Sequence, residues 1–131
     1  MRVLYGVVGE GMGHATRSRV ILEHLVDSGH EVRVVVSGRA HTFLRGVFDD
    51  RREITFEEIY GLHLIYDDNE LDRSESLFSN LEQAPDGILK NVNVYRKVAE
   101  EGFSPEIVIS DFESWAYLYG INHRLPVISI D

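Results

Sequence analysis

The stretch from Val3 to Arg17 reads VLYGVVGEGMGHATR and decides how this chain folds. It begins as an apolar segment, continues through closely spaced glycines and enters a pattern of helical spacing. Glycines allow the backbone to turn tightly and to approach a ligand without a Cβ in the way. The helix that follows directs its free N–H groups and the positive end of its dipole toward that ligand. A strand, a glycine-rich turn and a helix in this order predict an anion-binding loop.

Two common glycine loops fit this stretch poorly. A P-loop requires a lysine and then Ser or Thr after its last glycine, and no lysine follows Gly13. A dinucleotide-binding fingerprint has the form G-x-G-x-x-G, and counting from Gly9 its third glycine position is occupied by His14. That fingerprint also requires an acidic residue near the end of the second strand, where this chain has Ser37 and Gly38. A nucleotide-binding domain of a sugar epimerase or a dehydrogenase is therefore kept only as an alternative.

Size and composition describe one globular domain. The chain has 131 residues, of which 44% are hydrophobic, and this is enough for a packed core. Its net charge of −9 argues against a nucleic-acid-binding protein, which would show a basic surface. The chain has no cysteine, which excludes disulfides and thiol-based sites. No stretch reaches the roughly 18 consecutive apolar residues of a membrane span, and no secretory leader is present, so we expect a cytoplasmic protein.

Apolar runs alternate with segments of helical periodicity, which is typical of βαβ units around a parallel sheet. We therefore predict a Rossmann-like α/β domain, an open twisted parallel sheet with helices on both faces. The predicted strands are residues 2–8, 31–37, 54–59, 107–110 and 127–130. The predicted helices are residues 15–28, 39–47 and 114–119, together with a helical stretch from about residue 74 that breaks and restarts at Pro85-Asp86. Residues 62–71 are predicted to form a small excursion about a polar turn.

Four segments, in this order, resemble the N-terminal half of a GT-B glycosyltransferase, specifically the MurG-like family 28 group. They are Gly11-x-Gly13-His14, residues 28–32 (SGHEV), residues 105–111 (PEIVISD) and residues 125–131 (LPVISID). These segments are distributed over almost the whole length of the chain, from residue 11 to residue 131. One difference is that MurG itself has a glycine pair before its histidine, whereas Met12 interrupts the run here.

The resemblance implies an enzyme of two domains, each of which binds one of the two substrates. The N-terminal domain of such an enzyme binds the acceptor, and a C-terminal domain holds the nucleotide-sugar donor. The implied reaction is an inverting transfer of the sugar to an acceptor hydroxyl, and it needs no bound metal or other cofactor. The acceptor is either a sugar or a lipid-linked molecule.

The chain stops at Asp131, at the tip of a predicted central strand whose second face has no helix to cover it. We therefore expect residues 1–131 to be a single acceptor-binding domain, a fragment of a longer two-domain enzyme that is inactive by itself. A stand-alone subunit that gains activity with a donor-binding partner protein is the alternative.

His14 is the candidate catalytic base, because an imidazole can accept a proton from a hydroxyl near pH 7. The alternative is that His14 caps the helix or bonds a loop carbonyl. Arg17 lies one turn into the helix and is a candidate for holding a phosphate or carboxylate, with a surface ion pair to Glu10 or Glu23 as the alternative. The residues expected to bind the acceptor or a phosphate at this loop are Gly9, Glu10, Gly11, Met12, Gly13 and Arg17.

Two acidic residues follow a predicted strand, at the sheet edge where open α/β proteins place their ligands. Asp111 is the second candidate catalytic residue, because it can orient His14 or bind acceptor hydroxyls. Glu113 is a candidate for acceptor binding. The alternative for Asp111 is that it caps the next helix together with Ser114. Trp115 either stacks on a sugar ring or belongs to the core, and the remaining histidines show no metal-ligand spacing.

A segment at residues 39–52 combines apolar side chains with arginines. Some MurG-like enzymes meet lipid-linked acceptors at the membrane surface, so this segment is the candidate for peripheral contact with the inner face of the membrane. The alternative is a core helix with solvated arginines. The residues concerned are Phe43, Leu44, Val47 and Phe48, with Arg39, Arg45, Arg51 and Arg52.

Overall fold

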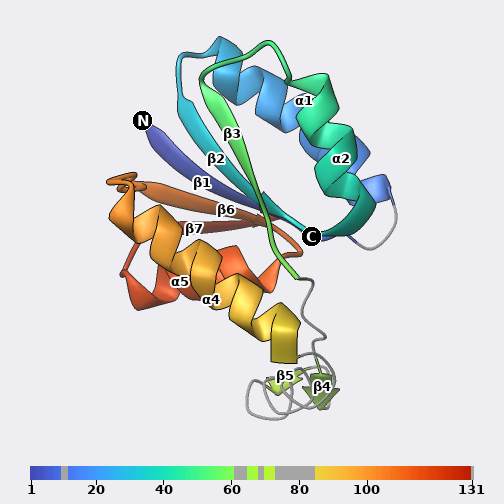
Figure 1. Ribbon diagram of the computed structural model, residues 1–131, viewed down its shortest axis with the longest axis vertical. Helices are drawn as coiled ribbons and strands as arrows, with labels where there is room; N and C mark the ends of the chain where they lie inside the picture. Colours follow the sequence, from blue (N-terminus) through green and yellow to red (C-terminus); the bar gives the residue numbers. More distant parts are fainter. Residues whose placement is uncertain (10–11, 61–64, 68–69, 73–84, 131) are drawn as a thin grey trace.

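The protein is a parallel sheet covered by helices on both faces, as Figure 1 shows. A computed structural model describes residues 1–9, 12–60, 65–67, 70–72 and 85–130. The strands of the main sheet are β1 (Arg2–Val7), β2 (Glu31–Val36), β3 (Ile54–Glu58), β6 (Ile107–Asp111) and β7 (Val127–Ile130). The helices are α1 (Gly13–Asp27), α2 (Gly38–Val47), α4 (Pro85–Glu100) and α5 (Ser114–Asn122). The predicted Rossmann-like α/β architecture is confirmed.

The order of the strands in the sheet is β3-β2-β1-β6-β7, and all neighbours are parallel. From β1 the chain adds β2 and β3 on one side of this strand. It later adds β6 and β7 on the other side. The order therefore reverses between β1 and β6, where Val3 pairs with Ile107 and Val7 with Asp111. Open α/β sheets bind ligands outside the carboxyl ends of their strands at such a switch point.

Two apolar clusters hold the layers together, because successive strand residues point to opposite faces of the sheet. Val3, Tyr5 and Val7 of β1 belong to the cluster that α1 and α2 cover. Leu4, between them, belongs to the cluster on the other face, where α4 and α5 pack. The residues of both clusters are buried, and their packing holds the helices against the two faces of the sheet.

Several boundaries follow the predictions and a few differ. α1 ends just before Gly29, whose φ of +88° closes the helix as expected of a glycine. α4 begins at Pro85, the predicted restart, while the helical stretch expected before it lies outside the described residues. The excursion predicted for residues 62–71 overlaps with two antiparallel strands, β4 (Ile65–Asp67) and β5 (Glu70–Asp72). β7, predicted to be central, is an edge strand in the described part of the sheet, as is β3 at the other side.

Helix α5 runs to Asn122 instead of ending at Gly120. Gly120 is not a stop signal here, because its Cα lies directly against the sheet. A Cβ at this position would come within 2.6 Å of Val127 Cγ2 and 3.1 Å of Val108 Cγ2. The glycine therefore permits close packing of a helix that continues past it.

The segment singled out for membrane contact forms α2 and the turn after it, and its apolar side chains face the core. Leu44 and Phe48 are buried, and Phe43 and Val47 pack against the same cluster. The alternative of a core helix is thus confirmed for this segment, because none of these four side chains is left fully exposed. Within the described residues, no helix combines the length and apolar character needed to cross a membrane.

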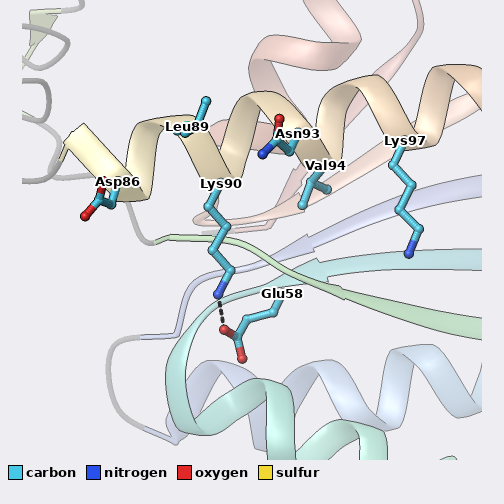
Figure 2. Close-up of a pocket in the computed structure, with 7 residues that line it drawn as sticks. All are labelled: Glu58, Asp86, Leu89, Lys90, Asn93, Val94 and Lys97. Atoms are coloured by element: carbon cyan, nitrogen blue, oxygen red, sulfur yellow. Dashed lines mark hydrogen bonds and ion pairs between the residues drawn. The ribbon is translucent and has the colours of Figure 1, made fainter.

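Ion pairs tie α4 to β3 (Figure 2). Lys90 pairs with Glu58, and Lys97 pairs with Glu57 with 2.9 Å between Nζ and Oε1. An open groove runs along this side of α4. Its lining residues are Glu58, Asp86, Leu89, Lys90, Asn93, Val94 and Lys97. Both lysines that line the groove thus form ion pairs with carboxylates of β3.

Candidate active site at the carboxyl ends of β1 and β6

The loop after β1 lies beside the end of β6. The Val8 N–H donates to the carbonyl oxygen of Asp111 at 3.2 Å, which extends the pairing of the two strands by one residue. Met12 is the N-cap residue of α1, and its carbonyl oxygen accepts bonds from the N–H and the hydroxyl of Thr16. Of the predicted loop residues, Glu10 and Gly11 lie outside the described part of the chain.

The two described glycines of the loop differ in their surroundings. A Cβ at Gly9 would lie 2.0 Å from the carbonyl oxygen of Ser37, so this glycine lets the loop pass close to the end of β2. A Cβ at Gly13 would meet nothing within 4 Å. Gly9 is thus required by packing, whereas Gly13 leaves open space at the start of α1.

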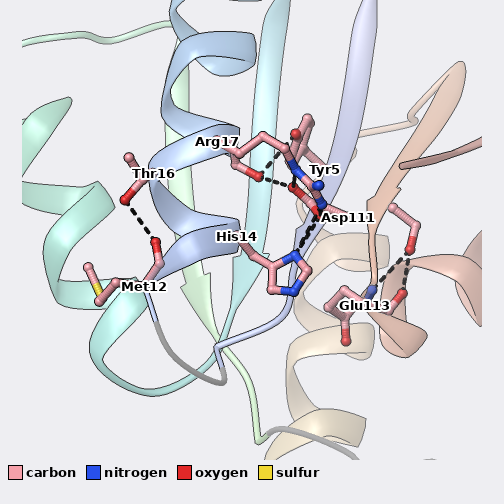
Figure 3. A network of polar contacts seen from close by, with 9 residues as sticks. Tyr5, Met12, His14, Thr16, Arg17, Asp111 and Glu113 are labelled. Atoms are coloured by element: carbon pink, nitrogen blue, oxygen red, sulfur yellow. Dashed lines mark hydrogen bonds and ion pairs between the residues drawn. The ribbon is translucent and has the colours of Figure 1, made fainter. Parts of the chain in front are cut away.

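Asp111 is the centre of the polar network in Figure 3. Its side chain is 0% exposed, yet it receives hydrogen bonds from three residues of α1. His14 Nδ1 lies 3.0 Å from Oδ1, and Ser18 Oγ donates to Oδ2 at 2.6 Å. The guanidinium of Arg17 spans both oxygens, with Nη2 on Oδ1 and Nε 3.3 Å from Oδ2. The Tyr5 hydroxyl extends the network by donating to Ser18 Oγ at 3.2 Å.

These contacts explain the electrostatics of the site. Burial opposes ionisation of Asp111, but the hydrogen bonds from Arg17, Ser18 and His14 outweigh it, and the pKa of this carboxyl is lowered. Burial raises the pKa of Tyr5 to about 12, so its hydroxyl stays protonated as a donor. The site therefore contains one fixed carboxylate with donors arranged around it.

Two groups of opposite character lie against Nδ1 of His14: Oδ1 of Asp111 at 3.0 Å, which only accepts hydrogen bonds, and Nη2 of Arg17 at 3.1 Å, which only donates them. In the tautomer that donates from Nδ1 to Asp111, the second ring nitrogen, Nε2, is the one that can accept a proton. The imidazole side chain is 32% exposed, so a small molecule can reach it at the mouth of the site. His14 is thus paired with Asp111 and does not act as a helix cap.

Glu113 has a different role from Asp111. It is the N-cap residue of α5, and its carboxylate oxygens accept the N–H groups of Trp115 and Ala116 at 2.8 and 2.7 Å. The alternative that Asp111 caps this helix together with Ser114 is wrong, because Glu113 is the cap and Asp111 bonds to residues of α1. Burial raises the pKa of Glu113 to about 7, against the effect of the backbone N–H groups. Both of its oxygens are engaged in holding α5, which shapes the edge of the site.

Most of the predicted residues come together at one place. His14, Arg17 and Asp111 are in contact, and Gly9, Met12 and Gly13 form the adjoining loop. The surface pair between Arg17 and Glu23 does not form, since Glu23 pairs with Arg19. Trp115 is buried and its indole N–H donates to the carbonyl oxygen of Asn91, so it belongs to the core.

Two members of the network, Tyr5 and Ser18, are not among the residues predicted from the sequence. Tyr5 stands in an apolar strand and resembles any other core residue. Ser18 carries a usable signal, since it is the one polar residue in the buried stripe of α1, which otherwise consists of Ala15, Leu22 and Val26. In the described part of the chain, no group of three or more His, Asp or Glu side chains is arranged to hold a metal ion.

Two solved structures resemble nearly the whole of this chain. The structure described as the glycotransferase of kitacinnamycin has a TM-score of 0.59 at 19% identity, covering 98% of this chain and 29% of that one. The structure of LpCGTa in complex with UDP has a TM-score of 0.61 at 14% identity, covering 98% and 30%. At such identities the likeness concerns the fold, which is that of GT-B enzymes.

Sequence comparison points the same way. A glycosyltransferase of Methanosarcina acetivorans, described only as uncharacterized, is 25% identical over 130 residues. The match takes in 99% of this chain and 32% of the relative, so the chain spans about a third of that curated protein. The model of the family described as Glycosyl transferase family 1 matches residues 1–131. The chain, with its His14–Asp111 pair at the switch point of the sheet, therefore belongs to glycosyl transferase family 1.

Proposed function

We propose that residues 1–131 are the acceptor-binding domain of a two-domain inverting glycosyltransferase, with His14 as its catalytic base. The observation that carries this proposal is the contact between His14 and Asp111 at the carboxyl ends of β1 and β6. The imidazole of this pair is 32% exposed and lies at the carboxyl ends of the strands, where open α/β sheets bind ligands. The remainder of such an enzyme would supply the donor pocket.

The proposed reaction is a single displacement at the anomeric carbon of the donor sugar. The acceptor hydroxyl gives its proton to His14 Nε2 while its oxygen forms the new bond to that carbon. The bond between the carbon and the phosphate oxygen breaks, and the nucleoside diphosphate leaves with the electron pair. Asp111 stabilises the imidazolium that forms, because it is already ionised and bonded to Nδ1. Attack from the side opposite the leaving group inverts the anomeric configuration.

Arg17 and the glycine loop are proposed to position the acceptor or a nearby phosphate. The side chain of Arg17 is 40% exposed and bonds Asp111 at the mouth of the site. The open space at Gly13 and the N-terminal N–H groups of α1 lie beside it. The structurally similar LpCGTa was solved with UDP, which supports a uridine diphosphate sugar as the donor.

Finer features of the proposal come from the resemblance to MurG-like enzymes of family 28. The loop residues Gly11, Gly13 and His14 support this type of enzyme, in which the acceptor can be lipid-linked. Since the apolar side chains of α2 face the core, contact with the inner face of the membrane would depend on exposed arginines such as Arg39 and Arg45. The proposed location is the cytoplasm.

The alternative of an epimerase or dehydrogenase domain has less support. In place of the third fingerprint glycine stands His14, whose ring is bonded to Asp111. The residue that follows β2 is Ser37, where a dinucleotide-binding domain would present an acid to the ribose. The family match also favours a transferase.

Activity of His14 variants in the full-length protein tests the proposed function. Wild-type protein is incubated with UDP-, TDP- and GDP-sugars and a panel of phenols and pyranosides, and products are detected by mass spectrometry. We expect transfer with an inverted anomeric configuration by NMR, and a loss of about 100-fold or more in kcat for His14→Ala and Asp111→Asn. Binding of UDP, measured by calorimetry, should be unchanged in both variants.

His24→Ala is the matched control, because His24 is an exposed histidine of the same helix. It should retain wild-type turnover. Near-normal turnover of His14→Ala, or a product that retains the donor configuration, would contradict the proposal.

A further inference from the structure

Phe112 stands out between two buried carboxylates. Asp111 and Glu113 are 0% and 6% exposed, whereas the side chain of Phe112 is 48% exposed. Its φ is +59°, a region that a bulky side chain rarely adopts. A strained backbone and an exposed aromatic ring at the same residue are both unfavourable for folding alone, and strain of this kind is concentrated at functional sites.

The local hydrogen bonds hold this conformation in place. The Ser110 hydroxyl donates to the carbonyl oxygen of Glu113 at 2.6 Å and accepts the Glu113 N–H at 3.2 Å. Asp111 is anchored to α1 on one side of Phe112, and Glu113 is anchored to α5 on the other. The chain between them has to pass through the left-handed region, and this turns the Phe112 ring outward.

The ring meets the candidate base. The centroids of Phe112 and His14 are 5.6 Å apart and their planes are tilted by 39°. A molecule whose hydroxyl reaches His14 therefore has an apolar surface within contact distance. Aromatic rings in such positions favour the flat apolar faces of ligand rings.

We propose that Phe112 is a specificity-determining residue that packs against the ring of the acceptor carrying the reacting hydroxyl. This inference rests on the proposed function and adds the chemical class of the acceptor: a six-membered ring with an apolar face, either a pyranose or a phenol. Phe112 positions that ring so that its hydroxyl meets His14, and it takes no part in proton transfer.

Phe112→Gly separates this role from a structural one. Glycine adopts a φ of +59° without strain, so the variant should melt at the wild-type temperature or higher while it lacks the ring. Phe112→Asn is a second variant without the ring, because asparagine also tolerates this region. Arg124→Gly is the matched control, since Arg124 has a φ of +54° in the turn between α5 and β7, away from the site.

The experiment measures binding of two probes to the full-length protein by saturation-transfer NMR and titration: 4-methylumbelliferone as the phenol and methyl β-D-glucopyranoside as the pyranose. We expect wild-type protein to bind one of them, and the probe that binds identifies the type of ring. The dissociation constant should rise about fivefold in Phe112→Gly and Phe112→Asn. Arg124→Gly should bind as wild type, and Phe112→Tyr should restore most of the affinity.

Unchanged binding in Phe112→Gly, or no binding of either probe to wild-type protein, would overturn the inference. So would weaker binding that accompanies a lower melting temperature and is not restored in Phe112→Tyr. The two proposals fail separately. Loss of transfer in His14→Ala with unchanged probe binding in Phe112→Gly removes only the role of Phe112, whereas full transfer by His14→Ala removes the proposed function.

Discussion

Asp111 and Glu113 are two buried carboxyl groups, two residues apart, whose pKa values shift in opposite directions. Burial acts on both. Asp111 is also bonded to a guanidinium, a hydroxyl and an imidazole, and its pKa is lowered. Among the described residues the hydrogen-bond partners of the Glu113 carboxyl are backbone N–H groups, and burial raises its pKa to about 7. The hydrogen bonds from charged and polar side chains therefore keep Asp111 ionised beside His14, whereas Glu113, which lacks them, is a helix cap with a pKa near neutrality.

Glu113 is expected to make the stability of the protein fall between pH 4.5 and about 7. In this range the folded state keeps a proton that the unfolded chain has released, so a rise in pH favours unfolding. The effect should be on the order of 1–3 kcal/mol, measured by urea unfolding at pH 5.0 and 7.5. Glu113→Gln lacks this titration, so its free energy of unfolding should fall less. Parallel pH profiles for the two proteins would show that Glu113 does not titrate here.

At the level of elements, the loop between β1 and α1 combines a packing role with an open end. Gly9 lies against Ser37 and fixes the course of the loop past β2. In the described residues α1 has no side-chain cap, and its first turn carries no acidic side chain. An anion next to Gly13 would face the N-terminal N–H groups of this helix and the positive end of its dipole.

The two glycines should respond differently to alanine. Gly9→Ala brings a Cβ against the Ser37 carbonyl oxygen and should cost about 1–3 kcal/mol of stability by thermal unfolding. Gly13→Ala should leave stability unchanged or raise it by up to about 1 kcal/mol. It should nevertheless lower kcat/KM of the full-length enzyme about tenfold or more, because the methyl group enters the space proposed for the ligand.

Gly46→Ala provides the control for this comparison. Gly46 lies in α2, where a Cβ would also meet nothing within 4 Å, and it is remote from the loop. This variant should gain stability and keep wild-type kinetics. Wild-type kinetics for Gly13→Ala as well would place the ligand away from α1.

At the level of the whole molecule, β1 holds the structure together. It pairs with β2 on one side and β6 on the other, and its alternate side chains enter both apolar clusters. In the described residues β3 pairs with β2 alone. Asp111 ends β6, which pairs with β1, and His14 lies in α1, the helix that follows β1; both candidates are thus held next to the central strand, which favours a rigid site.

Hydrogen exchange should follow this arrangement. Backbone amides of Arg2–Val7 are expected to exchange at least about tenfold more slowly than those of Ile54–Glu58, because opening of an outer strand breaks fewer contacts. Mass spectrometry of peptides from the two segments measures the difference in the full-length protein. Equal protection of both strands would mean that the sheet opens only as one unit.

The sequence predicts the elements and most of the site, because its signals are local. Glycine and valine patterns locate the strands and helices, and the run before His14 identifies the loop. The sequence offers the orientation of His14 as one role of Asp111, but the bonds that Asp111 receives from Arg17 and Ser18 depend on packing of α1 across the sheet and could not be derived in this way. Tyr5 could not be predicted for the same reason: its hydroxyl joins the network through a hydrogen bond to Ser18, which lies in α1.

The placement of β6 next to β1 also affects how the protein is made. β1 is synthesised before both of the strands that pair with it, and the second of them, β6, begins only at Ile107. Until then β1 presents an unpaired edge, and an open strand edge invites pairing with other chains. Long-range pairing of this kind also slows folding. The central strand of the finished sheet is therefore the segment most exposed to aggregation while the chain is still on the ribosome.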